Sequence, residues 1–77
     1  MNPVYGVDAL DSVLNDPVDI VRAVGSNALG NIPVEKAVES LKKALSDPYG
    51  YVRYYAILGL SRIYNYEVTR SVNIDRD

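Results

Sequence analysis

The segment SDPYGYVRYYAILGL, residues 46–60, decides the fold because an earlier segment of the chain is built in the same way. That earlier segment is NDPVDIVRAVGSNAL, residues 15–29. In both, an Asp-Pro pair is followed, six residues after the aspartate, by an arginine. The aspartate and the arginine are Asp16 and Arg22 in the first segment and Asp47 and Arg53 in the second. The chain therefore contains one turn-and-helix unit twice.

The two units are offset by 31 residues, and aligning the first repeat with the second at this offset gives nine identical pairs. These pairs fall at apolar and turn positions: Val7/Val38, Leu10/Leu41, Leu14/Leu45, Asp16/Asp47, Pro17/Pro48, Val21/Val52, Arg22/Arg53, Leu29/Leu60 and Ile32/Ile63. A period between about 20 and 50 residues is the signature of a stacked-repeat protein. We expect a single domain with repeat 1 at about 4–32, repeat 2 at about 33–64 and a C-terminal tail at 65–77.

Each repeat has the pattern of two helices. Apolar residues recur at helical spacing up to Leu14, and Pro17 prevents that helix from continuing. Asp19 is the expected N-cap of the next helix, and Gly30 and Asn31 are suited to its C-terminal end. On this second helix we expect an inner side made of Val21, Val24, Ala28 and Leu29. The second repeat follows the same plan, and its last helix is expected to run from about Tyr51 to Tyr64.

Composition narrows the classes of function. Hydrophobic residues make up 48% of the chain, which is enough for a core, and the net charge of −2 provides no attraction to nucleic acid or to an acidic membrane. No apolar run approaches the roughly 20 residues that cross a bilayer, and the N-terminus lacks the features of a signal peptide. We expect a soluble, cytoplasmic protein that contacts no membrane.

The chain has no cysteine and no histidine. It therefore lacks a thiolate nucleophile, a cysteine-based zinc site, the commonest metal ligand and the usual general base at neutral pH. Carboxylate pairs such as Asp8 with Asp11 and Glu35 with Glu39 are expected to be solvated acids on exposed helix faces. We predict no catalytic residues, no metal and no cofactor, and hence a protein that is not an enzyme.

The segment LSDPYGYVRYYAILGLSRI, residues 45–63, resembles a HEAT-like repeat of the short variety found in phycobilisome lyases. The shared pattern is Leu-x-Asp near the end of one helix, Val-Arg at the start of the next, and then Ala and Leu-Gly. The resemblance implies an all-α fold, an α-solenoid fragment of two helical hairpins with four main helices and a possible short C-terminal helix. It also implies that the aspartates and arginines of the two turns form a structural ladder: Asp16, Arg22, Asp47 and Arg53.

The two repeats differ on the side of the last helix that faces away from the core. Four large residues are expected there: Tyr54, Ile57, Leu58 and Tyr64. The corresponding side of the second helix has Ala23, Ser26 and Asn27, which are small or polar. A helix that is apolar all round is normally buried all round. Two segments could cover this side: the tail, whose Val68 and Val72 could begin the first helix of a third repeat, or a second chain.

Because stacked repeats usually need about three units for stability, we expect a homodimer packed through its fourth helices. The function that fits best is a protein–protein interaction or scaffolding module that binds a partner or a second copy through this Tyr-rich face. Of the tyrosines, Tyr55 is expected to fill the core. Two alternatives stay open: a remnant or subunit of a lyase-type HEAT-like enzyme, and a weak nucleic-acid-binding module with Arg62 and Arg70 beside Tyr64 and Tyr66.

Overall fold

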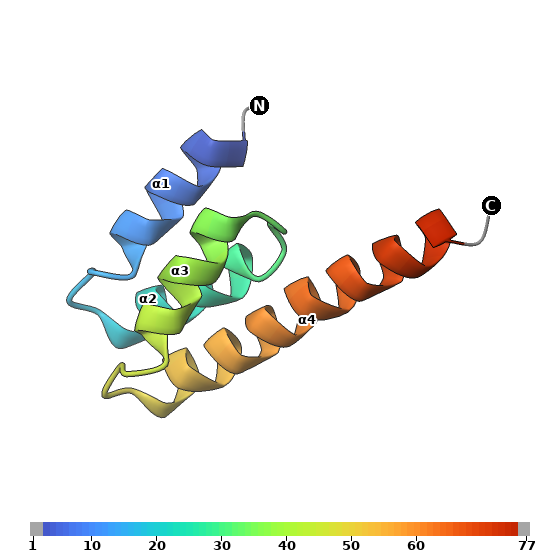
Figure 1. Ribbon diagram of the computed structural model, residues 1–77. Helices are drawn as coiled ribbons and strands as arrows, with labels where there is room; N and C mark the ends of the chain where they lie inside the picture. The colour runs from blue at the N-terminus through green and yellow to red at the C-terminus, as the bar shows by residue number, and fades with distance from the viewer. Residues whose placement is uncertain (1–2, 76–77) are drawn as a thin grey trace.

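Four helices joined by short turns make up the described chain (Figure 1). The computed structural model describes residues 3–75, with side-chain detail for residues 6–70, and this range contains no strand. The helices are α1 (Pro3–Val13), α2 (Asp19–Leu29), α3 (Glu35–Ala44) and α4 (Gly50–Asp75). The all-α fold expected from the sequence is confirmed.

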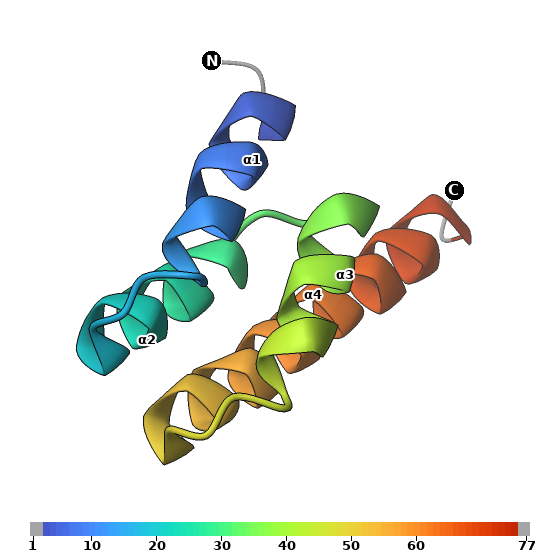
Figure 2. The same cartoon turned by 90° about the vertical axis from the view of Figure 1, so that its left-hand side faces the viewer.

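The helices pair into two hairpins that stand side by side. One hairpin is α1 with α2 and the other is α3 with α4, as the two views of the ribbon show (Figures 1 and 2). Helices α1 and α3 form one layer, and α2 and α4 form the other, where they make the most extensive contact between any two helices. This arrangement is that of an α-solenoid fragment.

The core lies between the two layers. Its fully buried larger side chains are Val7, Leu29, Leu41 and Val52, one from each helix. Four alanines and one isoleucine complete the core: Ala23, Ala37, Ala44, Ala56 and Ile63. Apolar residues recurring at a 31-residue offset thus pack into one continuous interior.

The structure corrects the expected inner side of α2. Val24 was expected to face inward but is 63% exposed, and Val21 lies at the edge of the solvent-exposed surface. Ala23 and Ser26 were expected to face outward but are buried. The cause is the position of α2, which packs on α1 and α3 and also directly on α4. The contact of α2 with α4 is made by small side chains. A helical wheel based on hydrophobicity places such side chains on the solvent side.

The contact between α2 and α4 is close because a glycine from each side meets the other. A Cβ added to Gly30 would lie 2.5 Å from the Cα of Gly59, and a Cβ added to Gly59 would lie 2.9 Å from the Cα of Gly30. Real side chains do not reach such distances, so the two backbones touch where only hydrogen atoms fit between them. Gly25 has a similar role against α1, since its added Cβ would lie 2.7 Å from Cγ1 of Val13.

The start of α2 also differs from the expectation. Val18 is the N-cap, with no side-chain cap hydrogen bond, and Asp19 is the first helical residue. Asp16 instead organises the turn, because its Oδ1 accepts a hydrogen bond from the N–H of Val18 at 2.8 Å. Asp19 remains favourable as an acidic residue in the first turn of a helix.

Helix α4 is longer than expected. It was predicted to end near Tyr64, but it continues without a break to Asp75 and projects beyond the rest of the molecule (Figure 1). Helix α2 ends before Gly30 and Pro33, whereas the counterparts of these residues at the 31-residue offset are Ser61 and Tyr64, and neither glycine nor proline occurs after them. Residues 65–75 therefore extend α4 instead of beginning a third hairpin, and residues 76–77 of the expected tail lie outside the described range.

We predict that Gly59→Ala destabilises the protein by about 1–3 kcal/mol, because the new methyl group would overlap the backbone of Gly30 and force the hairpins apart. Gly6→Ala is the matched control, since an added Cβ at Gly6 meets nothing within 4 Å. Within α1 the alanine should stabilise by up to about 1 kcal/mol. Chemical denaturation of the two variants measures both changes, and equal effects would contradict the close contact.

Candidate protein-interaction face

The 31-residue offset identifies which side of α4 a neighbouring helix would occupy. Three small residues of α2 and its C-cap are buried on the side toward α4: Ala23, Ser26 and Gly30. The Ser26 hydroxyl donates a hydrogen bond to the carbonyl oxygen of Val52 at 3.4 Å across this contact. The counterparts of the three small residues on α4 are Tyr54, Ile57 and Ser61. These α4 residues thus occupy the side on which a further hairpin would stack.

We call Tyr54, Ile57, Ser61 and Tyr64 the C-terminal stacking side. Ile57 is 58% exposed and Tyr64 is 69% exposed. Leu58, the remaining residue expected in the interface, lies one row to the side and is partly covered. The tail does not cover this side, because residues 65–75 continue straight along α4, so that candidate for the cover is wrong.

A second side of the molecule, on α2, is also uncovered by any neighbouring helix of the described chain. It was not predicted from the sequence. Val21 is the counterpart of Val52, which is fully buried beside α2. Val21, Val24 and Ala28 therefore lie where a preceding hairpin would stack, and we call them the N-terminal stacking side. The 31-residue offset could have identified this side, because it relates Val21 to the buried Val52 and Val24 to the half-buried Tyr55.

Tyrosines gather where α4 begins. The rings of Tyr49 and Tyr51 pack edge to face with centroids 5.5 Å apart, and those of Tyr54 and Tyr55 do so at 5.3 Å. Tyr49 and Tyr55 rest against the core, whereas Tyr51 and Tyr54 are exposed. An open apolar depression is lined by Tyr49, Gly50, Tyr51 and Tyr54. Aromatic surface of this kind provides large contact area with a polar tip.

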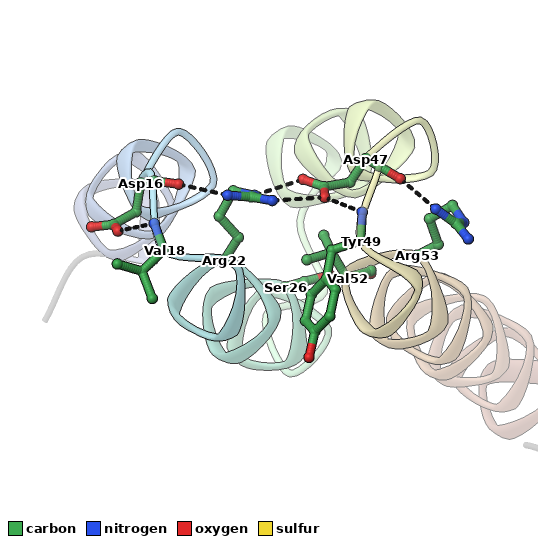
Figure 3. Close-up of polar contacts among 8 residues, drawn as sticks. All are labelled: Asp16, Val18, Arg22, Ser26, Asp47, Tyr49, Val52 and Arg53. Carbon is green, nitrogen blue, oxygen red and sulfur yellow. Dashed lines mark hydrogen bonds and ion pairs between the residues drawn. The ribbon is translucent and has the colours of Figure 1, made fainter.

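The turns are joined by a row of polar groups, which Figure 3 shows running across the molecule from Asp16 to Arg53. Arg22 lies at the centre of this row. Its Nη1 donates to the backbone oxygen of Asp16 at 2.9 Å, while its Nε and Nη2 donate to the two carboxylate oxygens of Asp47 at 2.9 and 3.1 Å. One arginine therefore holds its own turn and, through a bidentate ion pair, the turn of the next hairpin.

The second turn repeats this geometry only in part. Nη1 of Arg53 donates to the backbone oxygen of Asp47 at 2.7 Å, as Arg22 does to Asp16. Among the described side chains, no carboxylate is within ion-pair distance of Arg53. The Asp16 carboxylate, in turn, accepts from the N–H of Val18 but meets no described cation. The row thus ends in an arginine on one side and an aspartate on the other.

The ion pair shifts the pKa of both partners. Hydrogen bonding from Arg22 lowers the pKa of the Asp47 carboxyl below its ordinary value, and the N–H of Tyr49, at 2.9 Å from Oδ1, acts in the same direction. The hydrogen bond with Asp47 raises the pKa of the Arg22 guanidinium. Both side chains are largely buried, at 15% and 11% exposure, so solvent screens the pair only weakly.

Two acidic residues of α1 contact α3: Asp8 is exposed, as expected, whereas Asp11 is partly buried. Asp8 forms a salt bridge with Lys36, and Asp11 Oδ1 accepts a hydrogen bond from the Ser40 hydroxyl at 2.6 Å. These contacts join α1 to α3, the two helices of one layer. No group of three or more acidic side chains within the described residues is placed to hold a metal ion.

Arg62, expected in a possible nucleic-acid patch, is exposed but makes hydrogen bonds within the chain. Its Nη1 donates to Oδ1 of Asn31 at 2.8 Å, and its Nη2 donates to Oδ1 of Asn27 at 2.9 Å. The guanidinium therefore ties α4 to the end of α2. None of the described helices combines the length and apolar character needed to cross a bilayer.

Comparison with known proteins places these features in a family pattern. Residues 21–47 match the family model described as the PBS lyase HEAT-like repeat. This part of the chain is similar to a HEAT-like repeat. The matched segment of this repeat runs from α2 through α3 to the second turn, and the Arg22–Asp47 ion pair joins its two ends. No curated protein shows a significant match to the chain.

We predict that Asp47→Asn lowers the melting temperature by about 4 °C or more near neutral pH, because the amide loses the charge that binds Arg22 but can still accept from Tyr49. The folded-state pKa of Asp47 is below its ordinary value of 3.8, so the stabilisation is complete above that value and is lost as the pH falls through the lower one. Melting curves at about pH 7 and about pH 2 should show a difference that shrinks in acid. Glu67→Gln, at an exposed site on α4, is the control.

Proposed function

We propose that this HEAT-like repeat protein is a non-catalytic protein–protein interaction module, and that it binds through the C-terminal stacking side of α4. The observation that carries the proposal is internal to the chain. The counterparts of Tyr54 and Ile57 on α2 are Ala23 and Ser26, which are fully covered by another helix, while Tyr54 and Ile57 themselves are more than half exposed. A surface that this fold uses for stacking is therefore uncovered and apolar.

The chemistry of this side suits a protein partner. Exposed apolar patches on small proteins usually mark protein contacts, and tyrosine is enriched among the residues that dominate binding energy. Burying an isoleucine or a leucine from water contributes about 1.5–3 kcal/mol. The patch consists of Tyr54, Ile57, Leu58 and Tyr64, and the tyrosine-lined depression beside it extends the same apolar surface.

The partner in this proposal is a second copy of the chain, and the smallest assembly is a homodimer in the cytoplasm. Two copies together would contain four hairpins, which exceeds the roughly three repeats that stacked arrays generally need. The scaffolding role follows from the same geometry, because an array with an uncovered end accepts further units.

Nucleic acid is the less favoured partner, and two observations support that order. The net charge is −2, so the chain as a whole does not attract phosphate. The Arg62 guanidinium, which would have to contact phosphate or stack on a base, already donates to Asn27 and Asn31. A catalytic role would have to proceed without histidine or cysteine, neither of which the sequence contains.

We predict that the double variant Ile57→Glu, Leu58→Glu abolishes self-association, because two carboxylates would be placed in an apolar contact without partners. Size-exclusion chromatography with light scattering at micromolar concentration measures the mass. The unmodified chain should have a mass above that of one copy, and the variant should have the mass of a monomer.

Two single variants provide a matched comparison. Ile57 and Ile20 have nearly equal exposure, at 58% and 53%, but Ile20 lies outside both stacking sides. Ile57→Glu should weaken association by about tenfold or more, while Ile20→Glu should leave it unchanged. A monomeric unmodified chain, or a double variant that associates normally, would remove the proposal.

A further inference from the structure

We infer that the chain associates with a second copy of itself head to tail, so that the C-terminal stacking side of one copy rests on the N-terminal stacking side of the next. This inference rests on the proposed function, because it names the surface that meets α4. It differs from the packing of two α4 helices against each other, which the sequence analysis had led us to expect. The template for the contact is the one between the two hairpins within the chain.

The polar row supplies the first argument. Arg22 uses one nitrogen for the carbonyl of its own turn and two for the carboxylate of the following turn. Arg53 already makes the first of these bonds, to the carbonyl of Asp47 at 2.7 Å. Its Nε and Nη2 lack the second partner, a carboxylate, among the described side chains. A neighbour that continues the stack would have to bring an aspartate to this position.

The opposite end of the same molecule has that aspartate. Asp16 is arranged like Asp47, since the Oδ1 atoms of both accept from the N–H two residues further on, at 2.8 and 2.9 Å. The Asp47 carboxylate also accepts from Arg22, whereas the Asp16 carboxylate accepts from no arginine among the described side chains. Figure 3 shows Asp16 and Arg53 at opposite ends of the row. Placing two copies head to tail brings Arg53 of one to Asp16 of the other and repeats the Arg22–Asp47 geometry.

Charge complementarity of this kind selects a direction. A symmetric contact between two α4 helices offers Arg53 no Asp16, because Asp16 lies on the far side of each molecule. The head-to-tail contact satisfies both groups in one bidentate pair, and such pairs fix register and orientation.

The apolar surfaces supply the second argument, since they are related by the same 31-residue offset. On the N-terminal stacking side, Val21 corresponds to Val52, which is completely buried where α4 meets α2. Val24 corresponds to Tyr55, which is half-buried. Both valines are exposed in the single chain. Docking a second copy would cover them with Tyr54 and Ile57.

The proposed contact between copies differs from the contact within the chain in the sizes of the facing side chains. Within the chain, Ser26 of α2 reaches the carbonyl oxygen of Val52 on α4, and Tyr55, the α4 counterpart of Val24, packs against the core. Between copies, Tyr54 and Ile57 would lie opposite a surface where valine replaces that tyrosine. The two glycines of the internal contact become Ser61 and Ala28, so the helices must stay further apart than they do within the chain. The contact should therefore be looser than the internal one and reversible.

The geometry also explains why the occupant comes from another molecule. Helix α2 ends at Leu29 and a turn leads into α3. Helix α4 does not end at the corresponding residue, Leu60, but continues to Asp75. The described chain therefore supplies no third hairpin to its own C-terminal stacking side. Because a head-to-tail contact leaves one free side at each end, larger assemblies should grow with concentration unless a ring closes.

Two blocked variants test the inference. The first carries Ile57→Glu and Leu58→Glu and blocks the C-terminal stacking side. The second carries Val21→Glu and Val24→Glu and blocks the N-terminal stacking side. Circular dichroism and melting curves establish that each folds, and light scattering gives the mass of each alone and of the 1:1 mixture. We expect each variant to be monomeric and the mixture to form a dimer, since each retains the side that the other lacks.

The outcomes separate this inference from the proposed function. If the second variant associates as the unmodified chain does while the first is monomeric, α4 binds but the head-to-tail contact is wrong. Two monomeric variants whose mixture stays monomeric would also overturn the head-to-tail contact. If the first variant associates normally, the proposed function itself fails.

Charge reversal checks the same contact without altering apolar surface. Arg53→Asp alone and Asp16→Arg alone should each weaken association by about tenfold or more, and their 1:1 mixture should recover dimer formation. Arg70→Asp makes the same change of charge further along α4 and should leave association unchanged. Failure of the mixture to recover, with both variants folded, would overturn the pairing of Arg53 with Asp16.

Discussion

The contact between Gly30 and Gly59 sets the geometry on which the rest of the structure depends. Because neither residue has a side chain, α2 and α4 approach until their backbones touch. At this separation only small residues fit between the helices, so Ala23 and Ser26 are buried and the larger valines of α2 are turned outward. At the opposite end of α2, Arg22 reaches the carboxylate of Asp47. Close packing and polar recognition therefore join the two hairpins at opposite ends of the same helix.

The ion pair in turn specifies how the hairpins are aligned. A largely buried ion pair adds little net stability compared with apolar packing, because both charges lose hydration. Its bidentate geometry, however, tolerates little sliding of one hairpin along the other. Arg22 also bonds the carbonyl of Asp16, so the turn of its own hairpin is fixed by the same group. The glycines thus determine how near the hairpins lie, and the arginine determines their register.

Much of this architecture could be predicted from the sequence, since the 31-residue offset and the Asp-Pro turns were sufficient for four helices in two hairpins. The orientation of α2 could not, because hydrophobicity assigns valine to the core, whereas close helix contacts select glycine, alanine and serine. Tyr54 and Ile57 were correctly expected on the outer side of α4, where no close contact competes. The side formed by Val21 and Val24 was missed for the same reason that α2 was turned the wrong way.

The uninterrupted course of α4 shows how little separates a final hairpin from an internal one. After α2 the chain turns because glycine and proline occupy residues 30 and 33, and after the corresponding point in α4 it does not, because serine and tyrosine occupy residues 61 and 64. In such a protein, glycine and proline at the helix ends decide the number of hairpins, so an array could lengthen or shorten through a few substitutions at these positions.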